Sequence, residues 1–243
     1  MKIEFSTQIG EIVRRNFKTA QIFEKYDIDF CCGGGTSLSE ACAKSDADMD
    51  RLISEIESLL QAIDPESKYI EQLGMDQLCD FIVNRHHSYV SENIPFIQAK
   101  LEKLCSVHGS AHPELFKLNK LFETIAGNLA AHMKKEEFIL FPLISRIAKN
   151  YEEGYHEPLE SGRIQMVISE LEEEHQAEGE RLIIIRSLSN NYVCPPDGCN
   201  TFEVTYRTLA EFEQDLHRHI HLENNILFKK AINLEQELMK NSY

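Results

Sequence analysis

Ile125-Ala-Gly-Asn-Leu-Ala-Ala-His-Met-Lys-Lys-Glu136 decides the fold, because it carries the apolar rhythm of a helix and interrupts it with a histidine and a glutamate. Residues that recur in steps of four and three lie on one face of an α-helix and usually face a core. A buried imidazole or carboxylate is costly there unless it is paired or bound to a metal. The stretch therefore predicts a metal site inside a helical bundle. The inward positions are Ile125, Leu129, His132, Glu136, Ile139 and Leu143.

A second segment repeats this pattern with His219 and Glu223. Pairs of the type His-x-x-x-Glu also arise by chance in a glutamate-rich chain. A third pair, His156 and Glu160, falls in a stretch with glycine and proline that predicts a loop. The other two pairs differ from this one because their histidine and glutamate fall on the same helix face as the apolar residues. This position, rather than the motif itself, is the signal. The inward positions of the second segment are Phe212, Leu216, His219, Glu223 and Ile226.

Two further helices supply inward histidines. His175 lies in phase with neighbouring leucines and isoleucines, so it should point inward. In the first helix, His86 is in phase with Ile82 whereas His87 is in phase with Val83, and spacing does not choose between them. A lone histidine on an apolar face is more often a hydrogen-bonded core residue than a ligand. Four such positions on four helices, two of them paired with glutamate, favour a metal site.

Four imidazoles and two carboxylates are too many ligands for one tetrahedral zinc, and the cysteines lie off these helix faces. The set suits two metals bridged by carboxylates, with two imidazoles on each. Mixed nitrogen and oxygen ligation favours iron, with manganese as the alternative, over calcium or magnesium. The remaining polar residues receive other roles: Glu178 as hydrogen-bond acceptor or proton relay, Glu137 and Glu174 pointing elsewhere, His217 and His221 in solvent or beside the ligands, and His108 and His112 in solvent.

Helical periodicity recurs along nearly the whole chain and strand signals are nearly absent, so the sequence predicts an all-α protein. Residues 1–62 suggest a small domain of short helices, and Asp64-Pro-Glu-Ser-Lys68 suggests a linker over residues 63–70. Residues 71–243 predict an antiparallel four-helix bundle. Pro95 is a candidate break in its first helix, and Pro142 should loosen its second. The four helices are expected at about 73–106, 113–149, 161–189 and 201–238.

Composition excludes several classes of function. The chain has 243 residues and 42% hydrophobic content, which is enough for a buried core. The formal net charge of -15 disfavours nucleic acid and anionic membranes as partners. We expect no membrane-spanning helix and no secretion signal. Seven cysteines without a regular framework favour a reducing compartment, and hence the cytoplasm.

The vicinal cysteines in Cys31-Cys32-Gly33-Gly34-Gly35 form the second candidate site. The glycines permit a tight turn, and Ser37 should begin a helix just after it. Thiolates near a helix N-terminus have a lowered pKa and act as nucleophiles or soft-metal ligands. The alternative is a buried turn in which cysteine serves as a small apolar residue. The other cysteines, including Cys194 and Cys199, are interpreted as loop or helix filler.

Three longer motifs extend these candidate sites: Tyr26-Asp-Ile-Asp-Phe-Cys-Cys-Gly-Gly34, His132-Met-Lys-Lys-Glu-Glu-Phe-Ile-Leu-Phe-Pro142 and His219-Ile-His-Leu-Glu-Asn-Asn-Ile-Leu-Phe228. Together they resemble one family, the iron-sulfur cluster repair di-iron proteins, in which a small paired-cysteine domain precedes a hemerythrin-like antiparallel four-helix bundle. The chain departs from the family in its third glycine, Gly35, and in Glu174-His-Gln-Ala-Glu-Gly179. The resemblance implies two iron ions with an oxo or hydroxo bridge, held by His86, His132, Glu136, His175, His219 and Glu223, with Cys31 and Cys32 acting in thiol exchange or iron transfer.

The function that the resemblance implies is repair of iron-sulfur clusters damaged by oxidative or nitrosative stress, with iron supplied or cycled by the di-iron centre. Damaged iron-sulfur proteins would be the clients, and an unidentified reductant would take part. The alternatives are an enzyme that processes nitric oxide at the same centre, and a hemerythrin-like module that binds or senses oxygen or nitric oxide. The oligomeric state stays open, with a homodimer among the options.

Overall fold

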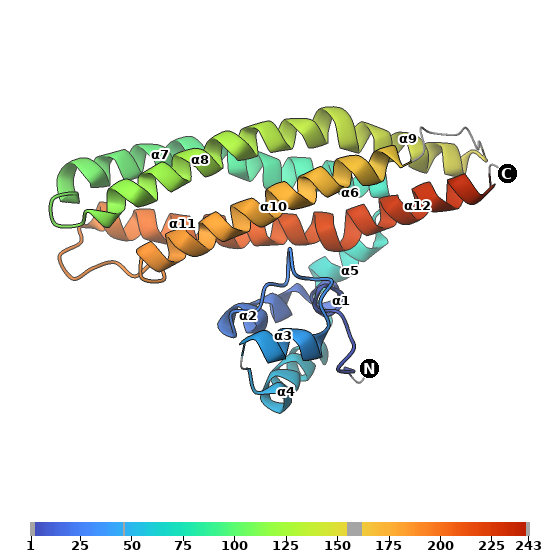
Figure 1. The fold of residues 1–243 in the computed structure, drawn as a ribbon, viewed down its shortest axis with the longest axis horizontal. Helices are drawn as coiled ribbons and strands as arrows, with labels where there is room; N and C mark the ends of the chain where they lie inside the picture. The colour runs from blue at the N-terminus through green and yellow to red at the C-terminus, as the bar shows by residue number, and fades with distance from the viewer. Residues whose placement is uncertain (1–2, 46, 155–161, 242–243) are drawn as a thin grey trace. The chain divides into compact units, whose positions relative to one another are not determined.

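The computed structural model describes residues 3–45, 47–154 and 162–241, and over these residues the chain is built from helices (Figure 1). One isolated bridge, between Gln8 and Ser37, is its only extended pairing there. The chain divides into two compact units, each considered by itself. None of the helices in the described ranges is long and apolar enough to cross a membrane. The first unit comprises Met1–Cys79, Ile144–Gln165 and Arg218–Tyr243, and the second comprises Asp80–Leu143 and Met166–His217.

The N-terminal part of the first unit consists of short helices, two of which begin at an aspartate cap. Asp48 and Asp64 accept hydrogen bonds from the backbone N–H groups three residues later, which begins a helix at each position. Residues 63–70, expected to be a linker, are therefore mostly helical, because Pro65 occupies the first helical turn, where its missing N–H costs nothing. The helices are α1 (Ile9–Arg15), the 3₁₀ helix η1 (Phe17–Thr19), α2 (Ala20–Lys25), α3 (Leu38–Ser45), α4 (Met49–Leu60) and α5 (Pro65–Gln72).

Longer helices follow, and several are continuous through short π-helical segments. The order is α6 (Met75–Ile82), π segment η2 (Val83–His87), α7 (Ser88–His108), α8 (Glu114–Lys135), π segment η3 (Glu136–Leu140), α9 (Phe141–Glu152), α10 (Arg163–Leu188), α11 (Asn200–Leu222), π segment η4 (Glu223–Leu227) and α12 (Phe228–Asn241). Pro95 lies inside α7, which continues past it, so the candidate break there is absent. His156 and Glu160 lie outside the described residues.

Contacts within the second unit confirm an antiparallel helical bundle. Asn128 donates to Glu178 at 2.7 Å and the Nε2 atoms of His132 and His175 lie 2.9 Å apart, so α8 and α10 run in opposite directions. His86 pairs with Asp215 on α11, while Tyr89, one turn later on α7, stacks on Phe212, one turn earlier on α11. Helices α7 and α11 are therefore antiparallel too. Arg186 of α10 bonds Glu213 of α11, and α7 packs along α8, which closes the bundle.

The π segment η3 shifts the buried face of its helix by one residue. Leu140 and Ile144 are fully buried, whereas the predicted inward residue Ile139 is 44% exposed. A π turn inserts one residue into the helical repeat, so every later position rotates relative to an uninterrupted α-helix. The loosening of the helix that we expect near Pro142 is thus a π-helical segment just before the proline. The predicted inward positions Ile139 and Leu143 are wrong for this reason.

Alanine substitutions of the buried Leu140 and of the exposed Ile139 test the shift of the buried face. Leu140→Ala should lower the free energy of unfolding by about 2–5 kcal/mol, because it leaves a cavity in the core. Ile139→Ala should change the free energy of unfolding by no more than about 0.5 kcal/mol, because its side chain is partly in solvent. Urea unfolding followed by circular dichroism measures both. Equal destabilisation by the two variants would contradict the shifted face.

Candidate metal centre

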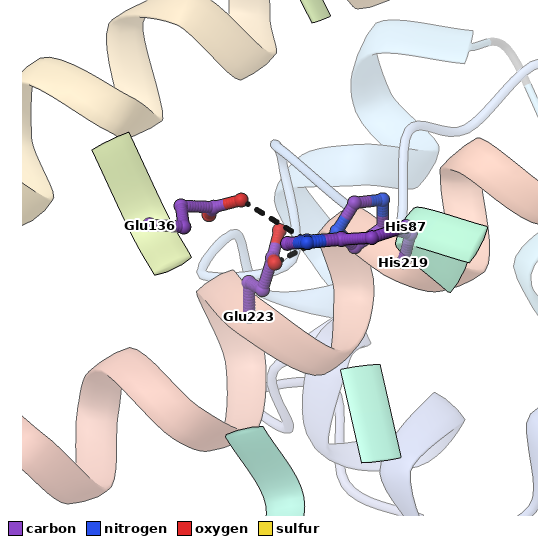
Figure 2. Close-up of side chains that lie close together, drawn as sticks. All are labelled: His87, Glu136, His219 and Glu223. Atoms are coloured by element: carbon purple, nitrogen blue, oxygen red, sulfur yellow. Dashed lines mark hydrogen bonds and ion pairs between the residues drawn. The ribbon is translucent and has the colours of Figure 1, made fainter. Parts of the chain in front are cut away.

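Glu136 stands at the first position of η3 with its carboxylate fully buried. Its Oε2 lies 3.3 Å from Nε2 of His87, and its Oε1 lies 3.3 Å from Nε2 of His132 (Figure 2 draws the first contact). The two imidazoles come from different helical segments, η2 and α8. A carboxylate whose two oxygens face two different imidazoles is suited to bridge two cations.

The imidazoles of His132 and His175 converge on one point. Their Nε2 atoms lie 2.9 Å apart between α8 and α10, and both side chains are buried. Two nitrogens that each offer a lone pair toward the same place are typical of metal ligands. In the first unit, Nε2 of His219 on α11 lies 2.8 Å from Oε1 of Glu223 in η4, one turn later (Figure 2).

Two groups of four buried residues could each hold a metal ion, and Glu136 and Glu223 belong to both. Within each group, one ligand atom per residue lies within 4.8 Å of the others. The shared residues are both carboxylates, and each group adds two imidazoles of its own. Imidazole and carboxylate donors together are suited to bind a transition-metal ion. The groups are His87, Glu136, His219 and Glu223, and His132, Glu136, His175 and Glu223.

Of the two neighbouring histidines, His87 belongs to one of these groups, whereas the family resemblance implies His86 as the ligand. Both rings are buried because the π turn of η2 brings two consecutive side chains to the inner face. Nε2 of His87 faces Glu136. His86 belongs to neither group of four, although its Nδ1 lies 3.0 Å from Oδ1 of Asp215, a contact that leaves Nε2 available to a metal. Spacing alone does not choose between His86 and His87, because an uninterrupted α-helix would place only one of them on the inner face.

Carboxylates that were expected to point elsewhere instead orient the imidazoles. Nδ1 of His87 lies 2.7 Å from Glu137, and Nδ1 of His132 lies 2.8 Å from Glu174. Each carboxylate can accept the Nδ1 proton, which leaves Nε2 available to a metal. Burial alone would raise the pKa of Glu174, but hydrogen bonds from Lys135 and His132 outweigh it and hold that pKa below its usual value. Adjacency to a ligand was the only sequence signal for Glu137 and Glu174.

Neutralising Glu174 should weaken metal binding. Glu174→Gln removes the charged acceptor for Nδ1 of His132, and loss of such an outer partner typically costs about 10- to 100-fold in metal affinity. Competition with a ferrous chelator measures this affinity. Glu173→Gln is the matched control, because it removes the same charge from the exposed neighbouring position. Equal affinities of the two variants would show that Glu174 does not support the ligand.

Two neighbours of the ligands have structural contacts. Glu178 accepts hydrogen bonds from Asn128 and from Arg181, and burial raises its pKa. His221 was expected in solvent or beside the ligands, but it is buried against the rings of Phe17 and Phe30. Burial lowers the pKa of His221 to about 3, so it stays neutral at physiological pH. Packing of the N-terminal helices, which spacing does not predict, accounts for its position.

The paired cysteines lie in a turn held by Asp29. Its Oδ1 accepts hydrogen bonds from the N–H groups of Cys31 and Cys32, both at 3.0 Å. Asn225 of η4 donates to the carbonyl of Cys31 at 2.9 Å. A Cβ atom on Gly34 would lie 2.4 Å from Asn225 Oδ1, so the turn needs glycine at its contact with η4. The turn is therefore docked two residues beyond Glu223.

The pKa of the Cys31 thiol differs from the sequence expectation. It is raised well above its usual value, first by the hydrogen bond with Cys32, then by burial and by the Asp29 carboxylate. The lowered pKa of the activated-thiol interpretation is therefore not found at Cys31, whose burial fits the alternative interpretation of a buried turn. Asp29, Cys31 and Cys32 nevertheless form a group that could hold a metal ion once the thiols lose their protons. Cys32 is the more exposed of the two cysteines.

Comparison with known proteins gives two family-model matches and close relatives along the chain. Residues 6–60 match a domain of unknown function, DUF542, and residues 80–231 match the hemerythrin HHE cation binding domain. The chain is 34% identical over 224 residues to the iron-sulfur cluster repair protein YtfE of Edwardsiella ictaluri, covering 92% of this chain and 96% of the relative. It is 31% identical over 222 residues to the iron-sulfur cluster repair protein ScdA of Staphylococcus haemolyticus, covering 91% and 96%.

Proposed function

The chain belongs to the family of iron-sulfur cluster repair proteins with a hemerythrin-type cation-binding domain, and from this we propose that it repairs clusters damaged by oxidative or nitrosative stress. Iron would come from a resident di-iron centre. The observation that carries the proposal is the pair of four-residue groups that share Glu136 and Glu223. Damaged iron-sulfur proteins would be the clients.

The residues present fit two iron ions. Glu136 and Glu223 are fully buried, and buried carboxylates are costly unless cations or hydrogen bonds compensate their charge. Glu137 and Glu174 add further negative charge at the outer nitrogens of the imidazoles. Two cations would neutralise this concentration of charge. Imidazole and carboxylate donors together favour iron over magnesium or calcium.

We propose His87, His132, His175 and His219 as the imidazole ligands and Glu136 and Glu223 as the bridges. When bound, the two irons would supply an oxo- or hydroxo-bridged redox centre. The affinity of the protein for these irons would depend on their oxidation state. Side chains of the protein orient the ligands. Glu137 and Glu174 hold the Nδ1 protons of two ligands, which keeps each Nε2 directed at the centre.

The cysteine turn is proposed to receive iron or to exchange thiols with a client. Asn225 connects the carbonyl of Cys31 to η4, the segment that begins with Glu223. A change in the coordination of Glu223 would therefore reach the turn through one short segment. Cys31, Cys32 and Asp29 offer two sulfurs and an oxygen as transient ligands.

An anaerobic repair assay tests this function. The full-length protein is loaded with isotopically labelled iron and mixed with an iron-sulfur dehydratase whose cluster nitric oxide has damaged. We expect the dehydratase to regain activity and to acquire the label faster than with an equal amount of free ferrous iron. A Cys31→Ser/Cys32→Ser variant should keep its iron but lose this advantage. Cys105→Ser is the matched control, because Cys105 is a half-buried thiol on α7.

Three outcomes are informative. Recovery of activity without transfer of the label would favour cycling of iron over donation. Equal recovery with the protein and with free iron would contradict the repair function. Full activity of the double cysteine variant would contradict the role of the turn while leaving the role of the di-iron centre intact.

A further inference from the structure

A second cluster of thiols and imidazoles lies at the end of the second unit where the loop 109–113 and the loop 189–199 meet (Figure 1). Nε2 of His108, the last residue of α7, lies 3.3 Å from Sγ of Cys199. His87 immediately precedes α7 at its other end. The 21 residues of α7 correspond to roughly 30 Å of helix, so this cluster is separate from the metal centre.

Cys199 has the features of an activated thiol. Its side chain is exposed, and it immediately precedes α11, where unpaired N–H groups and the helix dipole stabilise negative charge. A hydrogen bond with His108, followed by hydrogen bonds from the N–H groups of Phe202 and Thr201, lowers the pKa of Cys199 to about 7. About half of this thiol is therefore ionised at neutral pH. An imidazole paired with an exposed thiol is the arrangement that activates cysteine nucleophiles.

The surrounding residues hold this pair in place. The rings of His108 and His112 each make a T-shaped contact with the ring of Phe202, with ring centroids 5.4 Å apart in each case. Nε2 of His112 lies 3.1 Å from Asp197, and its Nδ1 lies 3.0 Å from Glu114. These carboxylates raise the pKa of His112, so the imidazolium ties the loop that carries Cys199 to the start of α8.

Cys194 supplies a second thiol beside the first. A β-turn, closed by the hydrogen bond from Gly198 N–H to the carbonyl of Pro195 at 2.8 Å, places Cys194 and Cys199 on its two sides. A Cβ atom on Gly198 would lie 2.4 Å from Sγ of Cys194, so this sulfur packs directly against the residue that precedes Cys199. Burial and the charge of Glu203 raise the pKa of Cys194. Cys194 therefore holds its proton more firmly than Cys199, which is partly ionised at neutral pH.

We propose that Cys199 and Cys194 form a redox-active dithiol that reacts with low-molecular-weight disulfides. The Cys199 thiolate attacks one sulfur of the disulfide, which forms a mixed disulfide and releases one small thiolate. Cys194 loses its proton to that leaving thiolate or to His108 and attacks the mixed disulfide. The products are a Cys194–Cys199 disulfide and two small thiols, so one disulfide is reduced as the two cysteines are oxidised. His108 is a positioning residue that stabilises the thiolate.

The expected advantage of Cys199 at pH 7 can be calculated. A pKa near 7 instead of 9 gives about 50-fold more thiolate. The more acidic thiolate is intrinsically less nucleophilic, by about eightfold for this pKa difference. Cys199 should therefore react about sixfold faster than an equally accessible thiol of ordinary pKa.

Mass spectrometry of the full-length, iron-loaded protein treated with oxidised glutathione tests the proposal. The wild type should form the Cys194–Cys199 disulfide and release two glutathione thiols for each disulfide consumed. Cys194→Ser should instead accumulate glutathione on Cys199, and Cys199→Ser should leave Cys194 unmodified. Cys105 is the internal control, because burial raises its pKa.

The dependence of Cys199 alkylation on pH tests His108 separately. His108→Asn should move the midpoint of that profile to higher pH while circular dichroism stays unchanged. Asp197, Glu203, His112 and Cys194 are the other titratable groups around the thiol, and they remain in this variant. An unchanged midpoint would overturn the role of His108. Modification of Cys105 as fast as Cys199, or failure of Cys194→Ser to trap glutathione, would overturn the dithiol.

Discussion

Glu136→Ala is expected to remove most of the iron from the purified protein, because it deletes the carboxylate that we propose as a bridge and that belongs to both candidate ligand groups. The loss of affinity should exceed the roughly 10- to 100-fold that removal of an outer partner costs. Iron per chain, measured after anaerobic reconstitution and desalting, checks this result. Glu173→Ala, at an exposed position on α10, should retain the wild-type content. Two tightly held irons in Glu136→Ala would remove this residue from the site.

His87→Ala should lower the iron content to about half or less, whereas His86→Ala should retain both irons. The reason is that Nε2 of His87 faces Glu136, while His86 belongs to neither candidate ligand group. Each variant removes one buried imidazole from the same π segment, so each controls for the other. Metal analysis and the optical spectrum of the oxidised protein distinguish them. Iron loss in His86→Ala alone would restore the ligand that the family resemblance suggested.

The inward residues of three helices could be predicted from the sequence because their apolar spacing is regular up to the site. His132, Glu136, His175, His219 and Glu223 are all buried, as that spacing predicts. Asp64 and Pro65 also carried a readable helix-start signal, although their segment was interpreted as a linker. Local sequence was sufficient wherever an uninterrupted α-helix or its cap determined the direction of a side chain.

The π segments could not be predicted in this way. An analysis based on α-helical spacing places Ile139 inside and forces a choice between His86 and His87. The π turns instead bury Leu140 and bring both histidines to the inner face. Proline lies beside η3 only, so η2 and η4 carry no equivalent signal.

Contacts between elements far apart in the sequence account for the remaining differences. Glu174 reaches a histidine on another helix, and His221 is buried by rings from the N-terminal helices. Cys199 was interpreted as loop filler because its partner His108 is 91 residues away. Spacing within one helix contains no information about these contacts.

Mössbauer spectroscopy combined with metal analysis of the anaerobically reconstituted wild-type protein tests the central claim most directly. The two groups of ligands that share Glu136 and Glu223 predict two irons per chain. In the oxidised protein these irons should be magnetically coupled through their bridges and give a diamagnetic ground state. A single uncoupled iron, or one zinc per chain, would contradict the di-iron centre.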